Sequence, residues 1–310
     1  FLDHDDKLHP HALATVVAYL NKHKELDIIY SDEDKIDEHG NRREPFFKPD
    51  WSSDLLLSQN YTCHLSVYRK TLIDKINGVR AGTEGAQDYD LILRATEQTD
   101  KIQHIPHVLY HWRAVSGSTA LGAQEKDYAH QRAIEVLNDA IVRRNLCAEV
   151  LETGLGAYHR IRYDLPTPPP SVSVIIPTKD RIDLLSVCLK GLLEKTANAP
   201  FEVLIIDNNS TEARTFEYFE MIEKDERVRV LEFPGEFNFS AINNFAVSKA
   251  NGEIIILLNN DVEVIDESWL TELVSHAARP GVGAVGCRLY YPDDHVQHDG
   301  IIIGMGGVAG

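Results

Sequence analysis

Cysteine is scarce in this chain, and the cysteines present are not spaced to bind metal. Four cysteines are spread over 310 residues without a CxxC pair, which indicates free thiols in a reducing compartment rather than a disulfide framework or a zinc knuckle. Long apolar runs are also missing, and none approaches the ~18 to 20 residues of a membrane-spanning helix. The sequence has neither an initiating methionine nor a signal peptide. We therefore expect it to be a piece of a longer protein, in which targeting signals are not testable.

Basic residues are in the minority. Lysine and arginine number 31 against 48 acidic residues, giving a net charge of −17. This argues against a nucleic-acid partner, because binding phosphate backbones requires a basic surface. A divalent cation could still lie between an acidic site and an anionic substrate. The glycine-rich dinucleotide fingerprint is missing as well, which disfavours an NAD-type domain. With 43% hydrophobic residues the chain can bury a sizeable core, and its length predicts about two domains.

Proline is concentrated in one place, the run PTPPP at residues 166–170, which predicts a stiff linker. Beyond it, predicted strands and helices alternate with short links as far as residue 258. This alternation is typical of a doubly wound parallel sheet. Before it, the run Asp32-Glu33-Asp34 follows a predicted strand at residues 26–30. We interpret the run as a solvated loop, with a second metal site as the alternative.

An acidic tip closes the predicted strand at residues 254–258, where the apolar run breaks into NND (residues 259–261). Ligands of open α/β sheets bind just beyond such strand ends, which favours metal or nucleotide here, and a simple loop with a helix cap is the alternative. An offset of 256 residues aligns this tip with DHD at residues 3–5, which predicts an internal repeat.

Histidines surround the first tip, and zinc binding by His4, His9 and His11 is one interpretation. A spacing of two residues would put His9 and His11 on different faces of a helix, so we favour simple surface polarity.

Several short motifs, taken in order and spacing, resemble inverting family 2 glycosyltransferases of the GT-A fold. SVIIPTKDR, LIIDNNST and NFSAINNFAVSKANGEIIILLNNDVEV resemble the nucleotide-binding half of such an enzyme. FLDHDD, YSDEDKID, EPFFKPDWS, GAQDYDLILRATE and HIPHVLYHWR resemble the acceptor half. The resemblance covers most of the chain outside roughly residues 120–165. It is closest to bacterial tandem-domain enzymes that build rhamnan, O-antigen or other surface polysaccharides.

The resemblance implies an α/β chain with Rossmann-like GT-A sheets in two partial units. We expect residues 1–119 to be the acceptor-side half of a first glycosyltransferase domain. Residues 120–170 would supply a helix, a hairpin and the proline-rich linker, and residues 171–310 the nucleotide-sugar-binding half of a second domain. The isolated chain would then lack a complete active site unless the two halves dock.

The resemblance also implies catalytic residues. The family's (E/Q)D motif falls on Gln87-Asp88, which makes Asp88 the base that takes the acceptor proton, with Asp90 as second choice and helix capping as the alternative role of Asp88. The family's DxD metal motif falls on Asp3 and Asp5. In the second unit Asn259 replaces the first acid, so Asp261 alone would ligate. His111 would close over the metal or the diphosphate, and a satisfied, partly buried histidine is the alternative.

The remaining implied residues bind the nucleotide-sugar, and helix capping is the alternative for several of them. They are Pro177, Thr178, Asp180, Arg181, Asp207, Asn208, Ser210, Asn238, Asn243, Asn244, Asn259 and Asn260.

The resemblance thus implies a transferase that uses Mg²⁺ or Mn²⁺ and moves a sugar from a UDP-, dTDP- or GDP-sugar to a glycan or lipid-linked glycan in cell-surface polysaccharide synthesis. We expect it in the cytoplasm, at the inner face of the membrane or peripherally associated with it. The alternatives are a sugar nucleotidyltransferase, or a catalytically silent nucleotide-sugar or carbohydrate-binding module.

Overall fold

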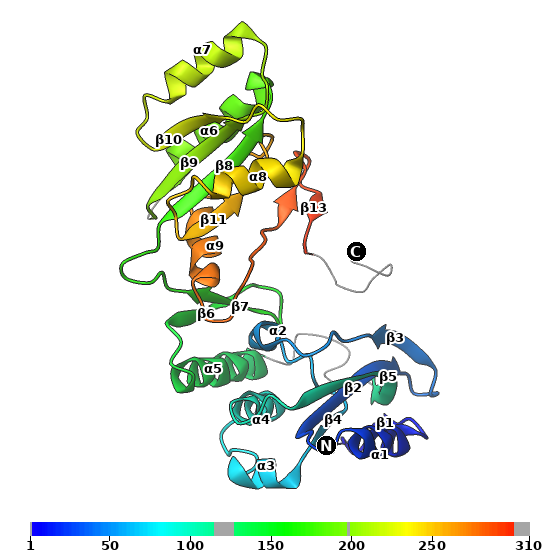
Figure 1. The fold of residues 1–310 in the computed structure, drawn as a ribbon. Helices are drawn as coiled ribbons and strands as arrows, with labels where there is room; N and C mark the ends of the chain where they lie inside the picture. The colour runs from blue at the N-terminus through cyan, green and yellow to red at the C-terminus, as the bar shows by residue number, and fades with distance from the viewer. Residues whose placement is uncertain (1, 115–126, 197–198, 301–310) are drawn as a thin grey trace. The chain divides into compact units, whose positions relative to one another are not determined.

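The computed structural model describes residues 2–114, 127–196 and 199–300, which form two compact units (Figure 1). The first unit is Phe1–Arg162 and the second is Tyr163–Gly310. Strands and helices are mixed in both units, so the α/β class expected from the sequence is confirmed. Within the described ranges no helix combines the length and the apolar character that crossing a membrane would require.

The first unit is built on a mixed sheet in the order β1-β5-β2-β3, in which β2 also pairs with β4. Only the β2–β5 pair is parallel. The strands are β1 (Lys7–Leu8), β2 (Ile28–Ile36), β3 (Arg42–Phe46), β4 (Ser66–Tyr68) and β5 (Ile102–Arg113). The helices are α1 (Ala12–Lys22), α2 (Ser53–Ser58), α3 (Lys70–Lys75), α4 (Gln87–Thr96) and α5 (Asp127–Arg143). A separate hairpin follows, β6 (Ala148–Glu152) and β7 (His159–Tyr163).

Strand β2 runs straight through the acidic residues 32–34, so the prediction of a solvated loop there is wrong. Asp32, Glu33 and Asp34 are only 3%, 8% and 2% exposed. They lie on a strand with neighbours on both edges, β5 on one side and β3 with β4 on the other. Buried carboxylates are tolerated only where charges or hydrogen-bond donors meet them, and each of these three has such partners.

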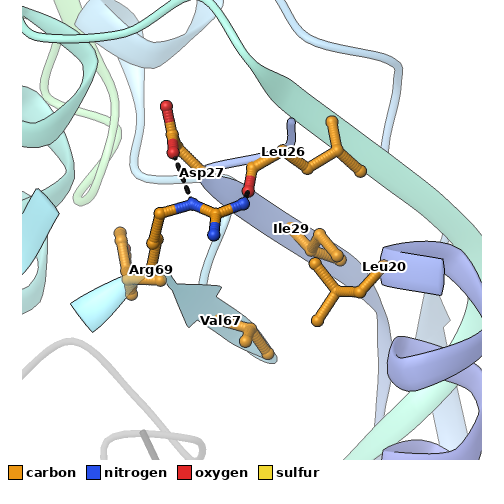
Figure 2. Close-up of a pocket in the computed structure, with 7 residues that line it drawn as sticks. Leu20, Leu26, Asp27, Ile29, Val67 and Arg69 are labelled. Carbon is orange, nitrogen blue, oxygen red and sulfur yellow. Dashed lines mark hydrogen bonds and ion pairs between the residues drawn. The ribbon is translucent and has the colours of Figure 1, made fainter. Parts of the chain in front are cut away.

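A small apolar pocket lies where α1 meets β2 and β4 (Figure 2). The Arg69 guanidinium closes one side of it, donating to Asp27 Oδ1 at 2.8 Å and to the carbonyl oxygen of Leu26 at 2.5 Å. None of the predicted site residues is among the seven that line it, which are Leu20, Leu26, Asp27, Ile29, Val67, Tyr68 and Arg69. We interpret this pocket as a packing feature, in which a basic side chain bridges the ends of two strands.

Two histidines join α5 to the hairpin. The rings of His130 and His159 stack with centroids 5.1 Å apart and planes at 14°, and His159 is 4% exposed. Burial, with a smaller effect from His130, lowers the pKa of His159 from 6.5 to about 4. The folded state therefore favours the neutral ring.

This pair predicts an acid-sensitive first unit. Because the folded pKa lies below the unfolded one, stability should be fully present above pH 6.5 and decline as the pH falls towards 4. His159→Phe should flatten that decline, since phenylalanine keeps the ring but does not titrate. Thermal melts at pH 7 and pH 4.5 measure the difference. Equal pH dependence in wild type and variant would contradict the assignment.

The second unit is built on an all-parallel sheet in the order β10-β9-β8-β11. Its strands are β8 (Val172–Thr178), β9 (Phe201–Asp207), β10 (Val228–Glu232) and β11 (Ile254–Leu257), followed by a short hairpin, β12 (Leu289–Tyr290) and β13 (Val296–His298). Its helices are α6 (Ile182–Lys195), α7 (Ala213–Ile222), α8 (Phe239–Val247) and α9 (Trp269–Ala277). Strands β8, β9 and β10 pair in chain order through helical crossovers, and β11 returns to pair with β8 on its other edge. This is the doubly wound parallel sheet that the sequence pattern predicted.

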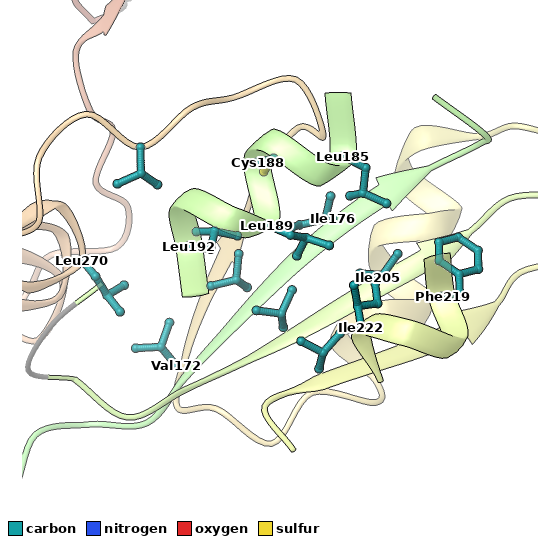
Figure 3. Close-up of a cluster of buried hydrophobic side chains, with 14 of the residues drawn as sticks. Val172, Ile176, Leu185, Cys188, Leu189, Leu192, Ile205, Phe219, Ile222 and Leu270 are labelled. Carbon is teal, nitrogen blue, oxygen red and sulfur yellow. The ribbon is translucent and has the colours of Figure 1, made fainter. Parts of the chain in front are cut away.

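Helices cover both faces of this sheet. On one face, apolar side chains of β8 and β9 pack against α6, α7 and α9, including Leu189, Phe219 and Leu270 (Figure 3). On the other face, Ile175 and Leu204 pack against Ile242 and its neighbours on α8. Burial on both faces explains why these strands read as continuous apolar runs instead of alternating ones.

Gly252 lies just before β11, where the chain passes very close to β8. A Cβ on Gly252 would lie 2.4 Å from Ser173 N and 2.6 Å from Val172 C, both backbone atoms. Gly252→Ala should therefore destabilise the second unit by about 1–3 kcal/mol, as overpacking does elsewhere. Urea unfolding measures the loss. Gly283→Ala is a matched control because no atom lies within 4 Å of its ideal Cβ. Equal stability of the two variants would show that the backbone relaxes freely.

Candidate active site

The acidic tip of the first unit is tied to β5 by Asp6, a residue that the sequence did not single out. Asp6 accepts hydrogen bonds from Tyr110 Oη at 2.5 Å and from the Arg113 backbone N–H at 2.7 Å. Burial raises the pKa of Asp6. The neighbouring Asp3 and Asp5 remain exposed. The tip therefore carries two solvent-exposed carboxylates on a loop that Asp6 anchors to β5.

His111 lies on β5, opposite Lys7 of β1, and is 8% exposed. Its Nδ1 lies 2.5 Å from Asp34 Oδ1, and Arg42 Nε donates to the other oxygen of that carboxylate at 2.5 Å. A carboxylate on one ring nitrogen fixes the orientation of the imidazole, as in many metal-ligating histidines. His111 is thus both the partly buried, satisfied histidine and a side chain that still has Nε2 to offer a ligand.

His9 and His11 lie closer together than the sequence suggested. Both precede α1, with His11 as its N-cap residue, so the expected separation on two helix faces does not apply. Their ring centroids are 5.5 Å apart, and that of His9 is 6.0 Å from that of His111. Burial and the neighbouring His11 and His111 lower the pKa of His9.

The tip at residues 3–5 does not supply enough protein ligands to hold a metal ion by itself. Across the described ranges, no group of three or more His, Cys, Asp or Glu side chains is arranged to hold a metal ion. Exposed carboxylates and an oriented imidazole do suit a hard cation in kind. Such donors fit an ion that takes its other ligands from a bound diphosphate.

Asp88 lies in the first turn of α4 and is exposed. The N-cap residue of this helix is Ala86, so Asp88 is not its cap. Asn60 Nδ2 donates to Asp88 Oδ2 at 3.0 Å, which holds the carboxylate in place at the surface. An exposed, oriented carboxylate at a helix start is suited to accept a proton from a bound hydroxyl.

Asp90, the second choice for the base, is fully buried. Its carboxylate pairs with Arg80 at 2.9 Å and with Arg94 at 2.8 Å. Two guanidinium groups neutralise it inside the unit, so it supports the packing of α4 and has no surface to offer an acceptor.

Asp32 and Glu33 hold Lys48 and His64, which lie on either side of α2 and of Asn60, the residue that contacts Asp88. Asp32 Oδ1 accepts the Lys48 backbone N–H at 2.9 Å and lies 2.8 Å from His104 Nε2. Glu33 lies 3.4 Å from Lys48 Nζ and is bonded to the backbone N–H of His64. Burial alone would raise the pKa of Glu33, but the hydrogen bond from His64 and the charge of Lys48 outweigh it and lower that pKa.

In the second unit, Asp180 links the turns after β8 and β9. Its Oδ1 accepts the backbone N–H groups of Thr211 and Glu212, both at 2.9 Å, at the start of α7. Its own N–H donates to Ser210 Oγ at 2.8 Å. The bond from Glu212, more than that from Thr211, lowers the pKa of Asp180. The Asp180 carboxylate is thus occupied by backbone donors, while Arg181, the N-cap residue of α6, is 60% exposed.

The end of β9 is similarly interlinked. Asp207 Oδ1 accepts the Ser210 N–H at 3.0 Å, and the side chain of Asn208 donates to the carbonyl oxygens of Phe233 and Gly235 at 3.1 and 2.8 Å. Asp207 and Asn208 are 6% and 4% exposed. These contacts fix the shape of the strand end, which is the capping and turn role that the sequence left as the alternative.

Three asparagines lie on or beside α8. Asn238 is its N-cap, accepting the Ala241 N–H at 2.9 Å. Asn243 is 5% exposed, and its Nδ2 donates to the carbonyl oxygen of Phe239 at 2.8 Å, whereas no described atom bonds its Oδ1. Asn244 is exposed. The Oδ1 atom of Asn243 therefore remains available as an acceptor, and capping of α8, which Asn238 performs, does not account for it.

The tip after β11 is joined to the end of β8. Asn260 Nδ2 donates to Thr178 Oγ1 at 3.0 Å, next to Pro177, and the backbone oxygen of Asn259 faces Cys188 Sγ at 3.8 Å. Asp261 is exposed, and its charge adds to that of Asp183 in raising the pKa of Arg181. The Asp261 carboxylate and the Arg181 guanidinium therefore lie near each other at the carboxyl edge of the sheet.

Comparison with known families identifies this second unit. Residues 173–303 match the model of "Glycosyl transferase family 2". This segment is similar to a family 2 glycosyltransferase domain. The match starts within β8 and includes every strand of the parallel sheet. The family 2 resemblance that the motifs carried is thereby confirmed.

Two curated relatives cover the whole chain. It is 46% identical over 315 residues to the uncharacterized protein y4gI of Sinorhizobium fredii, and 45% identical over 310 residues to the O-antigen biosynthesis protein RfbC of Myxococcus xanthus. The chain spans only 34% and 24% of the lengths of these relatives. Among solved structures, the mannosyltransferase PcManGT of Pyrobaculum calidifontis is 26% identical, with a TM-score of 0.38 over 42% of this chain and 39% of that one.

In the first unit the structure adds roles that sequence reasoning missed. Asn60, which holds Asp88, is a residue that the sequence did not mark at all. Asp6 and Asp34, which hold the tip and His111, were marked only as members of acidic runs. The signal for Asp34 was the unusual density of acids in a strand-like sequence. Nothing local marked Asn60, because its partner lies 28 residues away.

Proposed function

We propose that this chain belongs to a metal-dependent, inverting glycosyltransferase that moves a sugar from a nucleotide-sugar to a glycan or lipid-linked glycan acceptor in cell-surface polysaccharide synthesis. The observation that carries the proposal is the family 2 match over residues 173–303. The O-antigen biosynthesis protein, 45% identical over the whole chain, supports the choice of polysaccharide.

In the first unit Asp88 is the proposed base. The acceptor oxygen attacks the anomeric carbon, the bond from that carbon to the nucleoside diphosphate breaks, and the acceptor proton passes to Asp88. The carboxylate is exposed and held by Asn60 at 3.0 Å, which orients it without burying it. A single displacement of this kind inverts the anomeric configuration.

The proposed metal is Mg²⁺ or Mn²⁺. Asp3, Asp5 and His111 would hold it in the first domain and Asp261 in the second. Bound there, the ion neutralises charge on the departing diphosphate. The chain's own part is to present exposed carboxylates from an anchored loop and an imidazole oriented by Asp34.

Residues 1–119 and 171–310 are proposed to be complementary halves of two different domains, as the motifs suggest. An active site would then form only when flanking chain, or docking between halves, completes each domain. Activity of the purified 310 residues at dilute concentration would contradict this division. We propose that the whole protein works in the cytoplasm at the inner face of the membrane, which fractionation of native cells would test.

A second candidate function applies to the family 2 domain alone. Its tip has one acid, Asp261, and the amide of Asn260 is engaged with Thr178. A catalytically silent nucleotide-sugar-binding module would have little need for a stronger metal site. In that case Asp261→Ala would leave turnover unchanged and weaken only donor binding.

The test uses the full-length protein that contains this chain. Release of nucleoside diphosphate is measured with UDP-, dTDP- and GDP-sugars, with Mn²⁺ or Mg²⁺, and after EDTA treatment. We expect release with one nucleotide class, its loss with EDTA and its return with metal. Proton NMR of the product reports the anomeric configuration. Turnover that survives EDTA, or a retained configuration, would overturn the corresponding part of the proposal.

A further inference from the structure

Residues 47–52 lack regular secondary structure, yet side chains from several other elements hold them in place. They connect β3 to α2 and are named the 47–52 loop below. Four side chains outside the loop anchor it. The contacts are Tyr30 Oη to Pro49 O (2.7 Å), Lys48 N to Asp32 Oδ1 (2.9 Å), His104 Nδ1 to Asp50 Oδ1 (3.3 Å) and Ser52 N to Tyr61 Oη (2.8 Å).

The anchors of this loop are themselves buried. Tyr30 and Tyr61 are 0% and 1% exposed, and Asp32 and His104 are 3% and 6% exposed. The Lys48 side chain is buried too and pairs with Glu33. Buried polar groups that are fully satisfied make a local structure rigid and unique. Asp32 and Glu33 of β2 therefore help to fix the shape of a surface loop.

Against this rigid backbone the loop displays aromatic rings. Phe47 is 70% exposed, and Trp51 is partly exposed while its ring stacks on Tyr61 with centroids 6.3 Å apart and planes at 29°. Packing explains the buried rings of this unit but not an exposed phenylalanine on a pinned loop. Binding residues typically lie on loops that a rigid scaffold positions.

The loop is linked to the proposed base through Tyr61 and Asn60. Tyr61, on which Trp51 stacks, is the chain neighbour of Asn60, and Asn60 donates to Asp88. Tyr89, the residue after Asp88, donates to the carbonyl oxygen of Leu56 within α2. The segment that follows the loop is thus bonded to the first turn of α4 at Leu56 and at Asn60.

We propose that Phe47 and Trp51 form a platform for a pyranose ring of the acceptor, placing its hydroxyl next to Asp88. The C–H bonds on one face of a pyranose carry partial positive charge and pack on the negative face of an aromatic ring. Rings carried by a rigid loop offer such contact with little ordering cost. The platform rests on the proposed function, because a sugar acceptor is what gives it an occupant.

The binding test uses the 310-residue chain and methyl pyranosides as probes, namely those of glucose, galactose, mannose and rhamnose. Ligand-observed NMR titration measures affinity without turnover. We expect at least one glycoside to bind. Phe47→Ala and Trp51→Ala should each weaken it about threefold to tenfold, and Trp51→Phe, which keeps a ring, should largely restore it. Tyr158→Ala removes another exposed aromatic and should leave binding unchanged.

Binding of no glycoside, equal affinity in both alanine variants and wild type, or an equal loss in Tyr158→Ala would overturn the platform. A kinetic arm separates it from the proposed function. In the active full-length protein, Phe47→Ala should raise KM for the acceptor and leave KM for the donor unchanged. Sugar binding that depends on Phe47 in a protein without any transferase activity would refute the proposed function and leave the platform standing. Transfer with an unchanged acceptor KM would do the reverse.

Discussion

Asp88→Asn should lower sugar transfer by the first domain about 10²–10⁴-fold, the usual contribution of a positioned general base. Asparagine keeps the size of the side chain and can still meet the Asn60 amide, so the local structure should persist. The measurement is nucleoside diphosphate release by the full-length protein carrying Asp261→Ala, which reduces any contribution of the second domain. Donor affinity should stay the same, because the base contacts the acceptor.

Glu84→Gln is the matched control for that experiment. Glu84 is exposed, lies four residues before Asp88 and bonds backbone N–H groups of its own turn, that of Gly82 at 3.0 Å. Removing its charge should leave transfer within about twofold, as expected for a surface substitution away from the chemistry. Comparable activity of Asp88→Asn and Glu84→Gln would show that Asp88 is not the base.

Lys48→Met should destabilise the first unit by about 3–5 kcal/mol, the usual cost of breaking a buried ion pair from one side. The Lys48 ammonium is fully buried, lies 3.4 Å from Glu33 Oε2 and also donates to the carbonyl oxygen of His64. Methionine fills similar volume, so the loss reports the abandoned charge of Glu33. Urea unfolding followed by circular dichroism measures it.

The double variant Glu33→Gln/Lys48→Met tests that explanation. Removing both charges should recover much of the lost stability, whereas independent packing defects would add. The pH profile gives a second check. The folded pKa of Glu33 is lowered, so its contribution is present above its ordinary pKa of 4.5 and is lost as the pH falls through the lowered value. Glu33→Gln should remove that part of the acid sensitivity.

Local pattern was enough to predict the second unit and much of the first. Apolar runs bounded by turn residues predicted β8, β9 and β11, and the alternation of strands with helices predicted that they run parallel, whereas their order in the sheet came from the structure. The same reasoning failed at Asp32, Glu33 and Asp34, because a run of charged residues, judged from local sequence alone, is predicted to be exposed. Their partners, such as His104 and His111, come from β5 more than 70 residues away, and no spacing rule connects them.

The candidate site divides along the same line. The sequence identified Asp88, Asp180 and Asp261 as candidates because they lie at predicted strand ends or at a predicted helix start. Functional side chains are often found at such positions. What the sequence could not separate was which polar groups face outward. Asp180 proves to be bonded to the start of α7, whereas Asp88 and Asp261 are exposed. That distinction depends on the three-dimensional neighbours of each carboxylate.

The position of β11 at the edge of its sheet bears on how this protein behaves in solution. Among the described strands it pairs with β8 alone, and Leu257 on it is 53% exposed. An apolar strand with an open row of backbone donors and acceptors is a template for pairing with another chain. This chain should thus self-associate as its concentration rises. Covering the free edge of β11 should keep it monomeric.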